Sequence, residues 1–218
     1  MIRLDVPQRG AEWRQARIGI QTMSEASRLV TPTGNATKGA APDGYWRELL
    51  AEWATGESTG DFDAGSYWTE RGAWLEVDAM SYFTLVTGLD VEQAGFAYKD
   101  ESRMSGFSPD WWVLGDDGEV VAHAEVKCPS APMHLEYLLA DGCPRKYIPQ
   151  VQGGMWVTGM HGYFMSYHPD FPPALYALAP DAEWQATFTK VIPAFIERLL
   201  AGRERLIEMG VTPPGGST

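Results

Sequence analysis

The sequence predicts an α/β fold, a single domain in which helices flank a central mixed β-sheet. Its 218 residues suit one sizeable core and are too few for two comfortable domains. Hydrophobic residues make up 44% of the chain and aromatic residues 12%, which indicates a packed globular protein. Helical segments bracket a group of short alternating segments, as in a mixed sheet. We expect the domain to span 1–209 and the tail at 210–218 to be disordered.

The helices of the first half are predicted from their starts and stops. The segment 22–25 has the Thr-x-x-Glu pattern of a capping box and opens a short helix. Composition predicts a loop over 31–42. Asp43 is expected to cap a helix over 43–55, and a longer helix is predicted over 67–87. A glycine follows each of these two helices and is expected to end it.

Short strands dominate the second half. Residues 91–98 alternate loosely and predict one strand, and residues 111–114 and 119–127 predict an antiparallel pair joined by a Gly-Asp-Asp-Gly turn. The remaining expected elements are a helix over 147–157 with Pro149 in its first turn, strands over 163–167 and 175–178, and a long amphipathic helical stretch over 181–209 with a break near Pro193.

The tryptophans are predicted to be mainly core residues. One group lies at helical spacings: Trp13, Trp46, Trp53, Trp68 and Trp74. In the first strand of the hairpin, alternation predicts that one of Trp111 and Trp112 faces inward and the other outward.

The charge of the chain is acidic overall and uneven along its length. The net charge is −12, yet residues 1–42 carry six Lys or Arg against three Asp or Glu, whereas residues 43–101 carry three against thirteen. This distribution is compatible with an acidic shell around a local basic path, which a nucleic-acid partner would need. The charge alone favours an ordinary acidic cytoplasmic protein.

Segments that would direct the chain to a membrane or out of the cell are not evident. No apolar run approaches the roughly 20 residues of a membrane-spanning helix, and the first residues lack the apolar stretch of a secretory signal. Cys128 and Cys143 are the only cysteines and lack the spacing of a zinc or cluster site. We therefore expect a reduced, cytoplasmic setting.

The residues that indicate chemistry most directly are Asp110, Glu125 and Lys127. Glu125 and Lys127 lie two apart in a strand and share a face, and the hairpin could bring Asp110 within a few ångströms of Glu125. Two close carboxylates repel each other unless a cation lies between them, and hard oxygen ligands suit Mg²⁺ or Mn²⁺. A metal and an amine together can cleave a phosphodiester, because they stabilise the attacking water and the developing charge. A solvated hairpin with charged outward residues is an equal alternative for so short a pattern.

Two further acids lie in segments that could approach this site. Glu76 lies beside an apolar stripe of the 67–87 helix, where a carboxylate must be paired, protonated or bound to metal. Asp100 begins a turn, and the sequence is equally compatible with a hydrogen bond to its own backbone and with a catalytic role.

Sequence blocks from about residue 10 to residue 197 resemble the phage lambda exonuclease family, a group of YqaJ-like viral recombinases among the restriction-endonuclease-like nucleases. The resemblance implies a restriction-endonuclease-like nuclease core. The order and the spacing of the blocks both fit, and they are EWRQARIGIQTMSE (12–25), ERGAWLEVDA (70–79), YKDESRMSGFSPD (98–110), EVKCP (125–129), YIPQVQGGMWVTG (147–159) and the later IPAFIE.

The resemblance implies roles for residues within these blocks. Glu76, Asp110 and Glu125 would bind the catalytic metals, with help from the backbone carbonyl of Val126. Lys127 would orient or activate the water nucleophile. Magnesium would be the metal, with manganese as a substitute.

A second set of residues falls where the family binds the 5′-phosphate end of the digested strand: Arg17, Ser24, Ser108 and Gln150. A cation with hydroxyl and amide donors matches phosphate oxygens. Asp100 corresponds to an acidic position near the site. The loop at 31–42 lacks the basic residue that guides DNA in relatives, and Lys38 or Arg28 would have to substitute.

By this resemblance, the chain would be a 5′→3′ exonuclease that digests one strand of linear double-stranded DNA to 5′-mononucleotides and leaves a 3′ single strand. It would form a ring-shaped homotrimer and act beside a single-strand annealing recombinase in the cytoplasm of a bacterial host, as a phage or prophage protein. A related endonuclease or repair nuclease of the same superfamily is the alternative. An iron–sulfur nuclease would need four cysteines, and a non-catalytic DNA-binding remnant would not need the acids. A glycosidase would give Lys127 and the phosphate-binding set no role.

Overall fold

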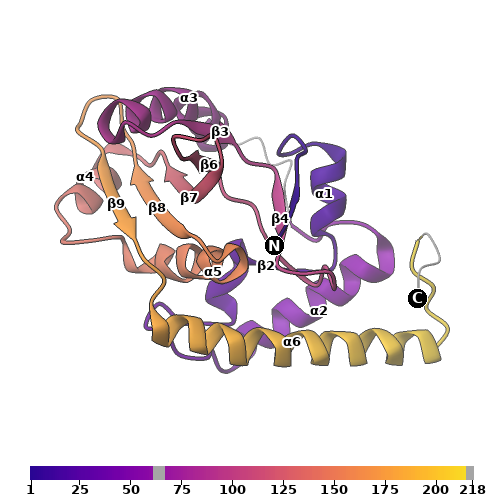
Figure 1. Cartoon of the computed structure of the whole chain (residues 1–218). Helices are drawn as coiled ribbons and strands as arrows, with labels where there is room; N and C mark the ends of the chain where they lie inside the picture. The colour runs from indigo at the N-terminus through magenta and orange to yellow at the C-terminus, as the bar shows by residue number, and fades with distance from the viewer. Residues whose placement is uncertain (61–66, 215–218) are drawn as a thin grey trace.

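The computed structural model describes residues 1–60 and 67–214, with 67–73 as backbone alone. Figure 1 shows strands enclosed by helices, with the long helix α6 along one side of the molecule. The strands are β1 (Ile2–Leu4), β2 (Gln21–Thr22), β3 (Val91–Gln93), β4 (Phe96–Tyr98), β5 (Ser105–Phe107), β6 (Trp111–Leu114), β7 (Val120–Lys127), β8 (His161–Ser166) and β9 (Ala174–Leu178). The α-helices are α1 (Ala11–Arg17), α2 (Ala40–Thr55), α3 (Tyr67–Thr87), α4 (Ala131–Leu138), α5 (Ile148–Thr158) and α6 (Ala182–Glu208), and the 3₁₀ turns are η1 (Met23–Arg28) and η2 (Arg145–Tyr147). This architecture confirms the predicted α/β class.

The strands form two sheets. The larger sheet has the order β3-β6-β7-β8-β9, with β7 and β8 parallel and the other neighbours antiparallel. The smaller sheet has the order β1-β4-β5-β2, with β2 and β5 parallel. The sequence predicted one central sheet and missed the second, because strands of two or three residues are too short to show an alternating pattern.

The single strand predicted over 91–98 is wrong. The segment forms β3 and β4, which belong to different sheets. Between them, a Cβ atom at Gly95 would lie 2.3 Å from the carbonyl oxygen of Leu4, so only glycine fits this close backbone approach. The chain leaves one sheet and joins the other at this point.

Helices cover both faces of the larger sheet. In Figure 1, α3 and α5 lie on opposite sides of its strands, and α3 packs Ala79 and Phe83 against β7. Trp111 packs with Ala79 and Phe83 of α3, whereas Trp112 packs with Ala94 and Ala97 on the other face, so the two are both buried, at 2% and 1% exposure. The expectation that one of them faces outward is wrong.

The C-terminal helix closes the core around the smaller sheet. Along α6, one stripe of buried side chains consists of Phe188, Ile192, Phe195 and Leu199. The break predicted near Pro193 is wrong, because the helix is continuous through this residue. Pro193 lies on the exposed face of the helix. Proline has no N–H, and water can bond the backbone carbonyl that is left without a partner. Buried residues before and after Pro193 pack against the core and hold the helix together.

Two predicted helix starts differ from the observed ones. Helix α2 begins after Gly39, which has a φ of 86°, and Asp43 lies in its first turn, where it pairs with Arg198 at 2.8 Å. The capping box is also wrong, because Thr22 precedes a 3₁₀ turn and its side chain makes no capping bond. Its Oγ1 instead lies 3.1 Å from Ser24 Oγ.

The other predicted elements are present with bounds close to those expected. Helices α2 and α3 end at Gly56 and Gly88, each with a φ of 71°. The hairpin turn closes with a bond from Gly115 N–H to the Glu119 carbonyl at 2.8 Å, and Pro149 lies in the first turn of α5. Helix α4 had no counterpart among the predictions.

Several expectations concern exposed or terminal residues. Trp74 was expected in the core but is 81% exposed on α3, and the side chain of Trp68 lies outside the described residues. Of the tail, residues 215–218 lie outside the description, whereas Pro214 lies next to Gly56. Within the described residues, no helix combines the length and the apolar character that crossing a bilayer requires.

Candidate active site

The β6–β7 hairpin brings Asp110, Glu125 and Lys127 together. The N–H of Asp110 donates to the Ala124 carbonyl at 3.1 Å, and its Oδ2 accepts from the N–H of Val126 at 2.6 Å. Lys127 Nζ donates to Glu125 Oε1 and lies 3.9 Å from Asp110 Oδ2. The ammonium group thus provides positive charge between the two carboxylates.

Burial separates this cluster from a solvated hairpin. The Glu125 side chain is 2% exposed. Burial, and then repulsion from Asp110, raise the pKa of Glu125 to about 7, although Lys127 and Gln150 act in the opposite direction. Burial disfavours the charged form of Lys127, but the two carboxylates outweigh this effect and raise its pKa. The solvated alternative therefore does not hold, and the site is a strongly coupled set of charges.

The donor set fits a divalent cation that is shared with the substrate. Glu125 Oε2 is buried and has no hydrogen-bond partner within the described residues, and such an oxygen needs a donor or a cation. In the part of the chain that the structure describes, no three His, Cys, Asp or Glu side chains are close enough to hold a metal ion by themselves. Mg²⁺ is commonly bound by one or two carboxylates together with waters and substrate phosphates. Asp110 and Glu125 fit that arrangement.

Glu76 borders the same site from α3. Its side chain is 34% exposed, and its Oε1 lies 3.9 Å from Arg9 Nη2. Burial and repulsion from Asp110 raise the pKa of Glu76, whereas Arg9 and Lys127 oppose the rise. Glu76 therefore lies in the electrostatic field of the cluster, and its role as a metal ligand stays a prediction.

Asp100 is placed differently from the other acids. Its Oδ1 accepts hydrogen bonds from the N–H of Ser102 at 3.0 Å and from Ser102 Oγ at 2.6 Å. The carboxylate thus bonds its own loop, as one of the two possibilities that the sequence left open predicts, and a catalytic role for Asp100 stays a prediction. Nothing described links this carboxylate to Asp110 or Glu125.

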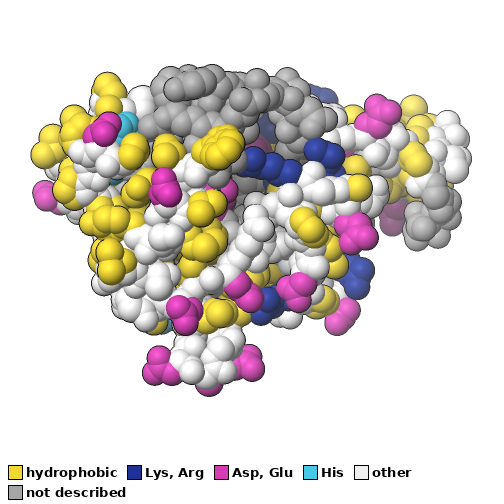
Figure 2. Space-filling view, turned by 90° about the horizontal axis from the view of Figure 1, so that it is seen from above, with side chains coloured by type: hydrophobic (Ala, Val, Ile, Leu, Met, Phe, Trp, Pro, Cys, Tyr) yellow, Lys and Arg dark blue, Asp and Glu magenta, His cyan; other side chains and the backbone are white. Residues whose placement is uncertain are grey.

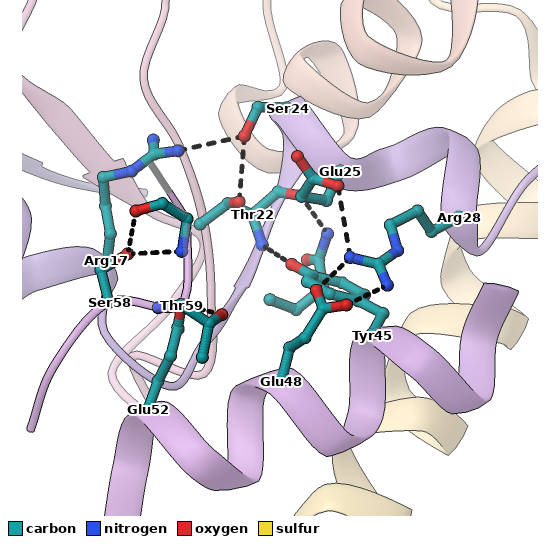
Figure 3. Close-up of polar contacts among 12 residues, drawn as sticks. Arg17, Thr22, Ser24, Glu25, Arg28, Tyr45, Glu48, Glu52, Ser58 and Thr59 are labelled. Carbon is teal, nitrogen blue, oxygen red and sulfur yellow. Dashed lines mark hydrogen bonds and ion pairs between the residues drawn. The ribbon is translucent and has the colours of Figure 1, made fainter. Parts of the chain in front are cut away.

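Arg17 and Ser24 line a pocket of about 390 Å³ between α1, η1 and α2. Arg17 Nη2 donates to Ser24 Oγ at 3.0 Å, and Figure 3 shows the guanidinium directed at this hydroxyl. The opposite wall is held by Arg28, which forms two hydrogen bonds with the carboxylate of Glu48. The pocket thus presents an anchored cation beside a hydroxyl group, which are suitable donors for a phosphate.

Another of the predicted phosphate ligands, Gln150, contacts the acidic cluster directly. Gln150 Nε2 donates to Glu125 Oε1 at 2.6 Å. Burial lowers the pKa of the Arg17 guanidinium, and negative charges around it, Glu125 among them, oppose this effect. Arginine stays charged under such shifts. The two predicted sets of residues are therefore neighbours.

Trp13 positions two residues of the predicted phosphate set and was not predicted to do so. Its Nε1 donates to Ser108 Oγ at 2.8 Å, and the guanidinium carbon of Arg17 lies 4.4 Å from its ring centroid. Ser108 in turn donates to the Gly95 carbonyl at 2.7 Å. The core position predicted for Trp13 is confirmed at 7% exposure. The spacing from Trp13 to Arg17, four residues on one helix face, was the signal for the additional role.

The surface charge is unevenly distributed over one face of the molecule. Figure 2 shows Lys and Arg side chains gathered near the middle of one face, beside a hollow, with acidic side chains spread more widely around them. This local concentration agrees with a basic path on an acidic protein.

The fold is similar to that of a known nuclease. The crystal structure of an alkaline exonuclease (LHK-Exo) from Laribacter hongkongensis is 27% identical, with a TM-score of 0.79 over 92% of this chain and 98% of that chain. The structure of LHK-Exo in complex with dAMP matches over the same shares of both chains at 27% identity and a TM-score of 0.78. A comparison with curated proteins gives no significant match.

The family assignment rests on a sequence match that covers more than half of the chain. The YqaJ-like viral recombinase domain matches residues 12–161, a span that contains all of the predicted metal and phosphate ligands. This match and the structural one both support a nuclease, and they confirm the resemblance seen in the sequence. The chain therefore belongs to the family of YqaJ-like viral recombinase domains.

Proposed function

We propose that this protein is a Mg²⁺-dependent exonuclease that digests one strand of linear double-stranded DNA in the 5′→3′ direction. It releases 5′-mononucleotides and leaves a 3′ single strand for recombination by strand annealing. The observation that carries the proposal is the contact between the two sets of residues, because Gln150 from the phosphate set donates to the buried Glu125 of the metal set at 2.6 Å. A site of this kind can hold the end of a strand while it cuts next to that end.

The chemistry is divided among the residues of the cluster. Asp110 and Glu125, with the Val126 carbonyl and Glu76, would hold Mg²⁺, or Mn²⁺ in its place, which supplies Lewis acidity at the scissile phosphate. Lys127 keeps its proton and stabilises negative charge that develops near Glu125. The buried position of Glu125 strengthens these electrostatic effects, because little water screens them.

The proximity of the two sets also supports mononucleotides as products. Ser108 and Asp110 are two residues apart, and two residues of chain span at most about 7 Å. This is the scale of one nucleotide step along a strand. A terminal phosphate held near Ser108 would therefore leave the next phosphate near Asp110.

The assembly and the partners are part of the same proposal. We infer a homotrimer that encircles DNA and acts beside a single-strand annealing recombinase in the cytoplasm of a bacterial host, on the resemblance to the family. Trp74 and Leu85 of α3 are 81% and 79% exposed, and large exposed apolar side chains are suited to subunit or partner contacts. Light scattering measures the assembly, and a monomer would contradict it.

The function is tested by digestion of linear duplex DNA with a 5′-phosphate or a 5′-hydroxyl end, in Mg²⁺ or in EDTA. We expect digestion of linear DNA in Mg²⁺, release of mononucleotides, and no reaction in EDTA. Closed circular DNA of the same sequence is the control. Equal cleavage of the circle would favour the related endonuclease instead, and activity that persists in EDTA would exclude the metal mechanism.

Arg17→Ala is expected to remove most of the preference for a 5′-phosphate end. A charge-assisted hydrogen bond to phosphate contributes about 1.5–3 kcal/mol, so kcat/KM on the phosphorylated end should fall about 10- to 100-fold. Activity on the 5′-hydroxyl end should change little, because that end carries no phosphate for Arg17 to bind. Competition between the two ends in one reaction measures the preference.

The matched control for this prediction is Arg47→Ala. Arg47 is exposed on α2 and lies outside the residues that line the pocket, so its replacement removes the same charge from the same region of the chain. If Arg17→Ala still distinguished the two ends as the unmodified protein does, the end-binding pocket would lie elsewhere.

A further inference from the structure

The turn at residues 7–10 contains a strained arginine. The N–H of Gly10 donates to the Pro7 carbonyl at 3.2 Å and closes the turn, and Arg9 within it has a φ of 65°. This left-handed conformation is unfavourable for a residue with a Cβ atom, and such strain persists only where surrounding contacts impose it. Strained backbone of this kind concentrates at functional sites.

The contacts that impose the strain attach the turn to the candidate active site. Gln8 Nε2 donates to the carbonyl of Pro109 at 2.6 Å and to the carbonyl of Ala94 at 2.9 Å. Pro109 directly precedes Asp110, so the turn is fixed to the same strand start that presents the metal-site carboxylate. The position of Arg9 is therefore coupled to that of Asp110.

The side chain of Arg9 is directed at the site and remains accessible. It is 52% exposed, and its Nη2 lies 3.9 Å from Glu76 Oε1. That separation allows electrostatic attraction but is too long for a hydrogen bond. The N–H groups of the Arg9 guanidinium therefore do not donate a hydrogen bond to Glu76. Arg9 opposes the rise in the pKa of Glu76 that burial and Asp110 cause.

Arg9 and Arg17 flank different parts of the site. Arg9 acts on Glu76, which also interacts with Asp110. Arg17 interacts with Glu125 and lies in the pocket with Ser24. Arg9 thus lies at the Glu76 side of the site and Arg17 at the Glu125 side, so a bound DNA strand would meet a cation on each side.

We propose that Arg9 binds a backbone phosphate of the DNA strand at the Glu76 edge of the active site, as a phosphate ligand in addition to the end-binding pocket. The proposal rests on the proposed function of the site as a DNA nuclease. A guanidinium group offers parallel N–H donors that match two phosphate oxygens. An incoming phosphate also needs positive charge here, because Glu76 and Asp110 would otherwise repel it.

The test measures DNA binding without cleavage. Each protein carries Lys127→Gln, which is expected to be inactive and keeps a hydrogen-bond donor for Glu125, and its affinity for a 5′-phosphorylated duplex is followed by fluorescence anisotropy over a range of salt concentrations. With Arg9→Gln, we expect about tenfold weaker binding. The slope of log affinity against log salt should fall by about one, since one phosphate contact is lost. In protein with Lys127 intact, Arg9→Gln should raise KM more than it lowers kcat.

Three further variants distinguish the effect of the guanidinium group from the effect of backbone strain and from that of losing any positive charge. Arg9→Gly relieves the left-handed strain and should weaken binding as much as Arg9→Gln without a lower Tm. Arg9→Lys keeps the charge and should restore the salt slope while recovering the affinity in part. Arg205→Gln removes the same charge from the far end of α6, where Arg205 pairs with Glu208, and should leave the salt slope unchanged.

The outcomes distinguish this proposal from the proposed function. If the parent protein neither binds duplex DNA nor, with Lys127 intact, digests it, the proposed function fails. If the parent protein binds and Arg9→Gln has the same affinity and slope, Arg9 is not a phosphate ligand. If Arg9→Gln changes only the Mg²⁺ concentration needed for activity, Arg9 serves Glu76 and the proposal is overturned.

Discussion

Lys127→Ala is expected to lower kcat by about a thousandfold or more while DNA binding is largely retained. The ammonium group of Lys127 contacts Glu125 and lies 3.9 Å from Asp110 Oδ2, and no other cation of the described cluster has contacts to both carboxylates. Its removal takes away positive charge where negative charge develops in the reaction. The proposed phosphate ligands are other residues and are not altered.

The measurement is single-turnover digestion of linear duplex, with affinity determined separately by anisotropy. Lys190→Ala is the matched control, because Lys190 is exposed on α6 and its loss removes the same charge. Near-normal turnover in Lys127→Ala would remove Lys127 from the mechanism. A parallel loss of binding would show that the residue holds DNA rather than promotes cleavage.

The same substitution also has a cost for stability, which the experiment must separate from catalysis. Without Lys127, Glu125 is buried at 2% exposure beside Asp110 with no cation, so its pKa should rise further and its carboxyl should take up a proton. The loss of the partner should therefore cost less than the about 3–5 kcal/mol of an uncompensated buried charge. Lys127→Gln retains a hydrogen-bond donor for Glu125 and should be better folded. Both variants are expected to be equally inactive, and circular dichroism confirms whether each is folded.

The sequence was sufficient to predict the elements that are long enough to show a repeating pattern of apolar residues. Helix α3 and the β6–β7 hairpin carry enough residues for their patterns to be recognised, and the glycine at 88 marks the end of α3. The second sheet could not be predicted, because β2 has two residues and takes its position from pairing with β5. Tertiary contacts, rather than local preference, determine such strands.

The candidate site divides in the same way. The period of a strand was enough to place Glu125 and Lys127 on one face, whereas Gln150 reaches Glu125 from a separate helix and could be assigned only through resemblance. Arg9 has a left-handed conformation next to Gln8, which bonds the carbonyl of the distant Pro109, and no local pattern encodes this arrangement. The wrong expectation for Trp74 has a similar origin, since helical spacing does not say which side of a helix meets the core.

Asp110→Asn is expected to abolish Mg²⁺-dependent cleavage without destabilising the protein that is free of metal. Loss of a metal ligand removes several kcal/mol of transition-state stabilisation, so the rate should fall by about a thousandfold or more. The fold should tolerate the change, because an amide oxygen can still accept the hydrogen bond that Asp110 Oδ2 accepts from Val126 at 2.6 Å. Burial, and then repulsion from Asp110, raise the pKa of both Glu76 and Glu125, and the neutral side chain of Asn relieves the repulsion.

Thermal unfolding with and without Mg²⁺ separates these effects. In EDTA, the Tm of Asp110→Asn should equal or exceed that of the unmodified protein, since the lost repulsion offsets the lost attraction to Lys127 across 3.9 Å. At a Mg²⁺ concentration of about 100 Kd, binding should stabilise the unmodified protein by about 2.7 kcal/mol. For a chain of this size that corresponds to a rise in Tm of about 5–10 °C. The variant should show little of this rise.

Asp116→Asn is the matched control, because Asp116 lies in the exposed turn of the same hairpin and its loss removes the same charge. That variant should keep both the activity and the Mg²⁺-dependent rise in Tm. If Asp110→Asn retained the rise, the metal would be bound by other residues. If its Tm in EDTA fell by as much as that of Lys127→Ala, the attraction between Asp110 and Lys127 would outweigh the repulsion among the acids. The carboxylate of Asp110 would then stabilise the fold. Repulsion between Asp110 and Glu125 would no longer be an argument for a cation between them.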